Sequence, residues 1–304
     1  MKRIICISVV LILLLPVLSN AQSLPFVAAE TDAVSLGRAG AGLADTGSSA
    51  YSSFSNAASI PFSDAKMDVA AGYTLWSPAY AKSNMLNVGA AFNLKDKFGV
   101  AVGFLYGMNP AYEITDANGV SKGQFNPSDI QMNIGLAWRF LPYMSLGANI
   151  GYAGSSLAEG YSHGAMIADV FAMASFSDFK VTAGIANLGS SVSSVSGKTF
   201  ALPTSAAVGL GYGAVFAERH SIEAYLDADY YFSNCFAVAA GAGYTFNDLV
   251  SVRAGYRYGG AALVPSYASV GLGMKLVGAR IDIAYILGSK TLGNTLAVGI
   301  GYSF

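Results

Sequence analysis

From Lys66 to the C-terminus, the sequence alternates large apolar residues with small or polar ones in segments of about ten residues. Strict alternation places every large apolar side chain on one face of a strand. The chain ends on this pattern, with large residues at Leu296, Val298, Ile300, Tyr302 and Phe304. The alternative is an amphipathic terminal strand of a soluble sandwich. We expect an outer-membrane β-barrel, in which the last strand pairs with the first and leaves no open apolar edge.

Fourteen such segments have the length of a tilted strand that crosses a bilayer. They are 66–76, 84–93, 98–107, 129–139, 144–156, 166–176, 179–187, 203–215, 221–231, 235–246, 249–258, 266–275, 279–287 and 294–304. Connections after even-numbered segments are short, and most others are longer, which is typical of a barrel whose termini face the periplasm. The sequence therefore predicts an all-β fold, a 14-stranded antiparallel transmembrane β-barrel over residues 66–304. In this register Val102 faces lipid and Gly103 faces the lumen, where serine is expected to be tolerated.

The N-terminus has the features of a cleaved secretory signal peptide at residues 1–21. Lys2 and Arg3 precede an apolar run, and small residues lead to Ala21. The exported chain is expected in the outer membrane of a Gram-negative bacterium, with outer-membrane lipid and the barrel-assembly machinery as partners. Cleavage leaves 15 basic and 18 acidic residues, a net charge of about −3, so nucleic acid is not an expected partner.

Residues 22–65 lie before the first strand and are rich in glycine, alanine and serine. A fourteen-stranded barrel encloses more space than its own side chains can fill. We therefore expect this segment to fold inside the lumen as a hatch or plug. The alternative is a disordered periplasmic tail.

Charged residues recur on the face opposite the lipid in three of the later segments. They are Glu223, Asp227, Asp229, Arg253, Arg257, Arg280 and Asp282. The segment 235–246 offers only alanine and glycine on that face, so guanidinium groups can reach across two strand spacings of ~5 Å each. One interpretation is a structural ladder of ion pairs that bonds to the hatch. The other is a polar constriction that sets what passes.

Neither catalysis nor metal binding is predicted. Ser162-His163-Gly164 is expected in a surface loop and His220 in a tight turn, where an imidazole is a solvated polar group rather than a catalytic base. There is no cysteine and histidine cluster for zinc, and Asp116–Gly119 predicts an Asx-type turn rather than a calcium loop. We expect no enzyme activity, no metal and no cofactor.

The N-terminal region also resembles a known family. Pro25-Phe26-Val27 leads to Asp32-Ala33 and to the glycine-rich stretch around Arg38, and Asn56-Ala57-Ala58 stands where that family has Asn-Pro-Ala. These residues resemble the PorV/PorQ family of outer-membrane proteins, itself similar to the fatty-acid transporter FadL. The resemblance implies a fourteen-stranded barrel with an N-terminal hatch that includes Asp32, Arg38 and Asn56. It also implies that Tyr302 and Phe304 form the signal that the assembly machinery engages.

Two functions follow from this resemblance. A protein of the PorV/PorQ type acts in secretion or transport across the outer membrane, with type IX secretion-system proteins as partners of its surface loops. A FadL-like transporter binds a hydrophobic small molecule, such as a long-chain fatty acid, near the hatch and releases it through an opening in the wall. Long structured loops favour the first function, and kinks or glycines in a wall strand favour the second.

Overall fold

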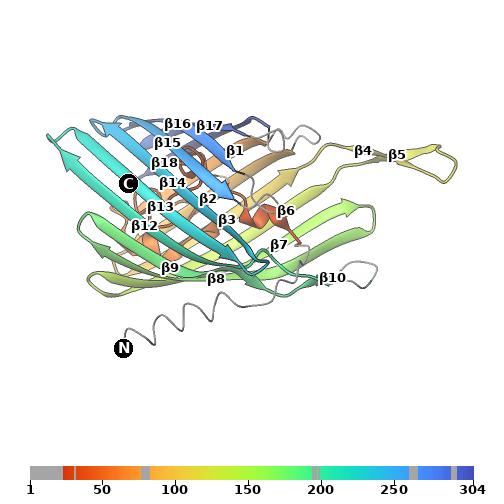
Figure 1. Ribbon diagram of the computed structural model, residues 1–304, viewed down its shortest axis with the longest axis horizontal. Helices are drawn as coiled ribbons and strands as arrows, with labels where there is room; N and C mark the ends of the chain where they lie inside the picture. The colour runs from red at the N-terminus through yellow and green to blue at the C-terminus, as the bar shows by residue number, and fades with distance from the viewer. Residues whose placement is uncertain are drawn as a thin grey trace.

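The wall of the molecule is a closed antiparallel barrel, shown in Figure 1. The computed structural model describes residues 23–30, 32–76, 83–193, 197, 199–259, 266–288 and 293–304. The fourteen wall strands are β1 (Met67–Trp76), β2 (Ser83–Leu94), β3 (Phe98–Met108), β6 (Ser128–Leu141), β7 (Met144–Ala158), β8 (Tyr161–Phe176), β9 (Phe179–Gly189), β12 (Ser205–Phe216), β13 (His220–Tyr231), β14 (Cys235–Phe246), β15 (Val250–Gly259), β16 (Tyr267–Leu276), β17 (Ala279–Leu287) and β18 (Thr295–Ser303). The predicted fold class is confirmed. The predicted signal peptide lies outside the described residues.

The two faces of the wall differ as the alternation predicts. Val102 and Ile134 point outward and are 46% and 58% exposed, whereas their neighbours Ala101 and Asn133 are buried inside. Small and polar residues on the inner face leave room in the lumen. Within the described residues, no helix has the length and apolarity needed to cross a membrane.

The barrel closes between its first and last strands. β1 pairs with β18 from Asp68 opposite Ser303 to Leu75 opposite Leu296. The backbone of Phe304 continues this closure, because its carbonyl accepts hydrogen bonds from the amides of Lys66 and Met67. The apolar terminal strand therefore has partners on both sides, as closure requires.

The connections distinguish the two ends of the barrel. Short turns such as 95–97 and 247–249 lie at one end, which we call the turn end. The loop end carries two hairpins, β4 (Tyr112–Thr115) with β5 (Ser121–Phe125), and β10 (Val192–Ser193) with β11 (Thr199–Phe200). Figure 1 shows the β4–β5 hairpin extending beyond the wall. At its tip, the Asp116 carboxylate accepts from the amides of Asn118 and Val120, which confirms the Asx-type turn.

The predicted surface loop at Ser162-His163-Gly164 is wrong. β7 and β8 continue to a turn at residues 159–160, and Ser155 pairs with His163 within their ladder. The polar residues of these strand ends do not alternate in hydrophobicity, so the apolar pattern stops before the strands do. His163 thus belongs to the wall rather than to a loop.

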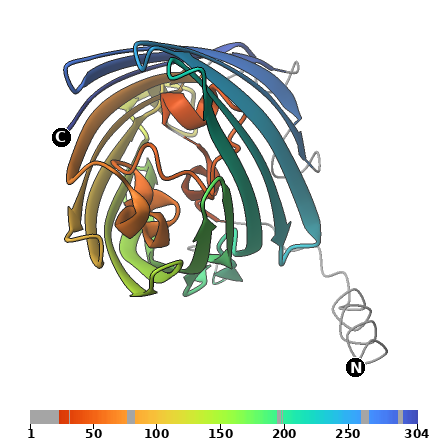
Figure 2. The same ribbon diagram turned by 90° about the vertical axis from the view of Figure 1, so that its left-hand side faces the viewer.

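The N-terminal segment, meaning residues 23–30 and 32–65, lies inside the ring of strands (Figure 2). It contains η1 (Pro25–Ala28), α2 (Ala33–Leu36), η2 (Ser52–Phe54) and η3 (Ala57–Phe62). The segment follows the inner wall around the lumen, since α2 contacts β16, β17 and β18, whereas η3 contacts β2, β3, β6, β7 and β8. That residues 22–65 act as a hatch stays a prediction.

Glycines of the wall stand where this segment approaches most closely. A Cβ at Gly147 would lie 2.2 Å from the Ala58 amide nitrogen, and one at Gly103 would lie 2.4 Å from the Ser53 hydroxyl and the Phe54 ring. The expectation that serine at Gly103 is tolerated is therefore wrong. The strand pattern gives the face of Gly103 but not the segment that packs against it.

Candidate functional site in the barrel lumen

Among the cavities lined by described residues of the lumen are an outer, a central and a turn-end cavity. The outer cavity, at the loop end, has a volume of about 510 Å³. The central cavity, of about 140 Å³, lies among the N-terminal segment and the wall. The turn-end cavity, of about 490 Å³, is lined by polar and charged residues of the short turns and strand ends, among them Arg219, Asp248 and Lys275.

The outer cavity is largely apolar. Leu24, Pro25 and Phe26 line it from the N-terminal segment, and Val192 and Phe200 line it from the β10–β11 hairpin. The wall contributes Asp129, Ser155, Leu157, Tyr161, Ser162 and His163. An apolar cavity of this volume with a few polar groups is typical of small-molecule sites.

The helix η1 separates the outer cavity from the central one. Leu24, Pro25 and Phe26 line the outer cavity, whereas Val27 and Ala28 line the central cavity. Leu24, Phe26 and Val27 belong to an apolar cluster that also includes Leu105, Ile167 and Leu202 of the barrel. One backbone hydrogen bond, 2.9 Å from the Ser23 amide to the Ala201 carbonyl, joins this end of the segment to the loop after β9.

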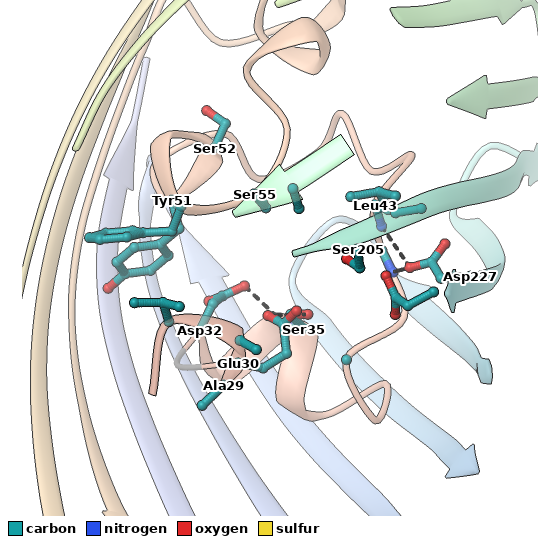
Figure 3. A pocket seen from close by; sticks show the side chains of 18 of the residues that line it. Ala29, Glu30, Asp32, Ser35, Leu43, Tyr51, Ser52, Ser55, Ser205 and Asp227 are labelled. Atoms are coloured by element: carbon teal, nitrogen blue, oxygen red, sulfur yellow. Dashed lines mark hydrogen bonds between the residues drawn. The ribbon is translucent and has the colours of Figure 1, made fainter. Parts of the chain in front are cut away.

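The central cavity is lined by carboxylates, as Figure 3 shows. Asp32 is the N-cap of α2, and its carboxylate accepts from the amides of Val34 and Ser35. Glu30 accepts a 3.2 Å hydrogen bond from the Ser35 hydroxyl. Burial raises the pKa of Glu30 to about 7, although the nearby Arg257 guanidinium opposes the shift. Burial also raises the pKa of Asp32.

Arg38 joins the N-terminal segment to the wall. The residue is 1% exposed, and its guanidinium carbon lies 4.3 Å from the centroid of the Tyr225 ring. Its guanidinium nitrogens lie 2.6 Å from an Asp45 oxygen and 3.1 Å from a Glu223 oxygen. The two carboxylates compensate the buried guanidinium, which would otherwise be strongly destabilising.

Three further arginines connect strands across a bare neighbour. Arg257 of β15 reaches over β14 to Asp229 at 3.0 Å, and Arg253 reaches over β16 to Asp282 at 2.8 Å. Arg280 pairs with Asp68 at 2.5 Å and lies 3.8 Å from Asp282. Alanine and glycine on the intervening strands leave these paths open, as the sequence predicts for β14.

Hydrogen bonds of Asp227, in the wall, and of Asn56, in the N-terminal segment, join the segment to the wall. The Asp227 carboxylate accepts from the amides of Gly42 and Leu43 at 2.7 and 2.8 Å. Asn56 accepts from the Ala58 amide and donates to the Leu43 carbonyl and the Thr182 hydroxyl. Arg253 does not pair with Asp227, because its guanidinium lies beside Glu223 and Asp282 instead. Whether these residues act as a structural ladder or as a constriction stays a prediction.

Sequence reasoning did not single out Asp45, Asp68 and Tyr225 as site residues. Asp68 had a usable signal, because it is an acidic residue at an inward position of the first predicted strand. Asp45 and Tyr225 had none, since their roles depend on the position of Arg38 above β13.

The predicted terminal signal and His220 lie at the turn end, whereas His163 lies at the loop end. Tyr302 and Phe304 are exposed at the turn end, with ring centroids 5.9 Å apart. His163 lines the outer cavity, and the His220 Nδ1 atom lies 2.7 Å from the Tyr244 hydroxyl. In the part of the chain that the structure describes, no group of three or more His, Cys, Asp or Glu residues is arranged to hold a metal ion.

The wall is irregular beside the central cavity. The pairing of β8 and β9 shifts register between Ala168 and Val170. Asn187 has a left-handed backbone with φ 56°, and its amide donates a 2.7 Å hydrogen bond to the Asp169 carboxylate. This is a bulge in β9, a feature that bends a strand and interrupts its ladder.

Solved structures with this architecture are known, although no protein-family model and no curated protein sequence matches the chain. The Ralstonia pickettii toluene transporter TbuX superimposes with a TM-score of 0.65 at 11% identity, covering 89% of this chain and 97% of that one. The Pseudomonas putida toluene transporter TodX gives 0.63 at 14% identity, with the same coverage. A Pseudomonas aeruginosa FadL homologue gives 0.57 at 12% identity, covering 90% and 98%.

The chain has the fold of the FadL-type barrels. Two of these matched structures are toluene transporters and the third is a FadL homologue. The FadL part of the sequence resemblance is thus supported as a fold, whereas the PorV/PorQ part stays a prediction.

Proposed function

We propose that this protein is an outer-membrane channel of FadL type that takes a small apolar compound into its loop end. The observation that carries the proposal is the apolar cavity of about 510 Å³ at the loop end, between η1 and the β10–β11 hairpin. The membrane is the outer membrane of a Gram-negative bacterium, in which the loop end faces outward and the turn end faces the periplasm. The short turns and the position of both wall termini support this orientation.

The arrangement of the cavities supports a path toward the periplasm. The outer cavity, the central cavity and the turn-end cavity occur in sequence, and η1 stands between the first two. The bulge in β9 lies beside the central cavity, because Asn187 lines it. An interrupted wall strand is the feature that favours a conduit for apolar compounds over a sealed barrel.

The proposal is tested by filling the outer cavity. Ser155 lines that cavity and is buried, whereas Ser121 of β5 is exposed and does not line it. Ser155→Phe should weaken binding of toluene about tenfold or more, and Ser121→Phe should leave it unchanged. Calorimetric titration of purified protein in detergent measures both, and subtracting the two variants removes partitioning into the micelle. Equal binding by the two variants would show that the cavity does not hold the ligand.

A role in secretion is the second candidate. The β4–β5 hairpin is a structured surface loop, with Tyr112 donating to the Leu157 carbonyl, and such loops favour a PorV/PorQ-type partner of a type IX system. Replacing residues 111–126 by a short turn should abolish secretion of cargo if the hairpin recruits secretion proteins. Toluene binding should be unchanged by the same replacement, so the two functions can be separated.

A further inference from the structure

Charges along the lumen are distributed unevenly. Among the described residues that line the outer cavity, Asp129 is the one Asp, Glu, Lys or Arg side chain. Its carboxylate accepts a 3.0 Å hydrogen bond from the Asn109 amide group, and no ion pair within the described residues includes it. An anion in this apolar cavity would meet a carboxylate and no guanidinium or ammonium group.

The central cavity repeats this imbalance. Five carboxylates line it, against the two guanidinium groups of Arg38 and Arg257. Asp45 and Asp229 pair with these arginines, so Glu30, Asp32 and Asp227 remain outside the ion pairs of the described residues. Asp227 is 4% exposed, and its second oxygen has no hydrogen-bond partner among the described residues. A ligand that passes η1 therefore enters a negative potential, which acts strongly where little water screens it.

Resting on the proposed function, we infer that the lumen excludes anions, so that its ligand is an apolar compound without a negative charge and not a carboxylate such as a fatty-acid anion. Asp129 acts at the outer cavity, and Glu30 and Asp227 act beyond η1. The two arginines that line the central cavity, Arg38 and Arg257, are each held by carboxylates of the protein. Displacing one would leave a buried carboxylate without a partner.

The experiment compares three probes of nearly equal shape: tert-butylbenzene, which is neutral, phenyltrimethylammonium and benzenesulfonate. Calorimetric titration at pH 8 and low ionic strength gives the affinity of the intact protein for each. Because either charge costs desolvation on entry, the effect of the lumen's own charge is the difference between cation and anion. We expect the cation to bind roughly tenfold more tightly than the anion, with the difference falling as salt is added.

Asp129→Asn tests the residue assigned to the outer cavity. The amide keeps the size of the side chain and an acceptor for Asn109, and it should reduce the difference between cation and anion several-fold. Asp116→Asn, at the tip of the β4–β5 hairpin, removes the same formal charge away from the cavity and should leave the difference unchanged.

The outcomes are distinguishable. Equal affinities for cation and anion in the parent, or tighter binding of benzenesulfonate, would overturn anion exclusion while leaving an apolar channel in place. An unchanged difference in Asp129→Asn would overturn the assignment to Asp129. If none of the three probes binds, the proposed function fails and the inference fails with it.

Discussion

At the scale of single residues, the inner wall is shaped to the N-terminal segment. Gly103 has no room for a side chain, because Phe54 and Ser53 already occupy the space in front of it. Gly213, on the inner face of β12, faces open space, and a Cβ there would be 3.9 Å from its nearest neighbour, the Ile222 carbonyl. Both glycines occupy inward positions of wall strands. Comparing substitutions at the two therefore separates the effect of packing against the N-terminal segment from the effect on the strand itself.

We expect Gly103→Ser to destabilise the barrel and Gly213→Ser to be nearly neutral. The first substitution overpacks a filled site, which costs about 1–3 kcal/mol, whereas the second adds a hydroxyl to solvent-accessible space. Unfolding in urea, followed by tryptophan fluorescence, measures both variants. Similar midpoints would mean that η2 does not occupy the space in front of Gly103.

Glu30 provides a second residue-scale prediction, through pH. Burial raises the pKa of its carboxyl from an ordinary 4.5 to about 7, so between these values the unfolded chain ionises before the folded one does. The parent should therefore lose stability relative to Glu30→Gln as the pH rises from 4.5 to 7, and the full loss should be present above pH 7.

A change of one unit in pKa corresponds to about 1.4 kcal/mol of stability. Because the Glu30 side chain is only partly buried and faces a cavity, solvent screening lowers the total for the whole shift, and we expect a difference of about 1–2 kcal/mol at pH 8. At pH 4 the two proteins should unfold at the same urea concentration. A constant difference between pH 4 and pH 8 would contradict a raised pKa.

At the scale of elements, the closure between β1 and β18 combines backbone bonds and aromatic side chains. The backbone amide and carbonyl of Phe304 form hydrogen bonds with Lys66 and Met67, at the start of β1. The ring of Phe304 is 61% exposed and packs near Tyr302. The ring therefore contributes little to the folded barrel. An exposed terminal ring is available for recognition during assembly.

Phe304→Ala should lower the amount of barrel in the outer membrane several-fold while leaving the unfolding midpoint of the purified protein unchanged. Deletion of Phe304 should lower both, because it also removes the backbone bonds to Lys66 and Met67. Membrane fractionation and urea unfolding provide the two measurements. Normal membrane levels of Phe304→Ala would rule out the ring as the assembly signal.

At the scale of the whole molecule, ion pairs join strands that are not neighbours. Arg253 and Arg257 both leave β15, one toward β17 and the other toward β13. The Nη1 atom of Arg257 also approaches the backbone of the N-terminal segment at Gly40. These residues hold the segment and its section of the wall in one arrangement.

We expect liposomes that carry the double variant Arg253→Ala with Arg257→Ala to leak small sugars, whereas parent liposomes stay tight. Loss of both guanidiniums leaves Asp229 without its ion-pair partner and weakens the hold on the segment. Deleting residues 22–65 should produce at least as large a leak, and Lys275→Ala, which removes an exposed pair with Asp248, should produce none. Free passage of sugars through the parent would instead indicate an open pore.

The sequence by itself determined the wall and much of the list of charged luminal residues. Alternation is local and has a period of two, so Val102 and Gly103 are assigned to opposite faces without knowledge of any partner strand. The same rule placed Arg257 and Asp229 on the inner face, and the small residues between them indicated that they could meet. The alternation rule does not identify strand ends that lack apolar alternation, such as the end of β8 at His163.

Only the tertiary structure decided what the lumen contains. The pairing of Arg38 with Asp45 and Glu223, the space in front of Gly103 and the apolar cavity above η1 all depend on the path of the N-terminal segment across the barrel. That path joins residues nearly two hundred positions apart, as between Arg38 and Glu223. No local pattern records it, because it is fixed by strand stagger and by close packing between two surfaces that meet only in the closed barrel.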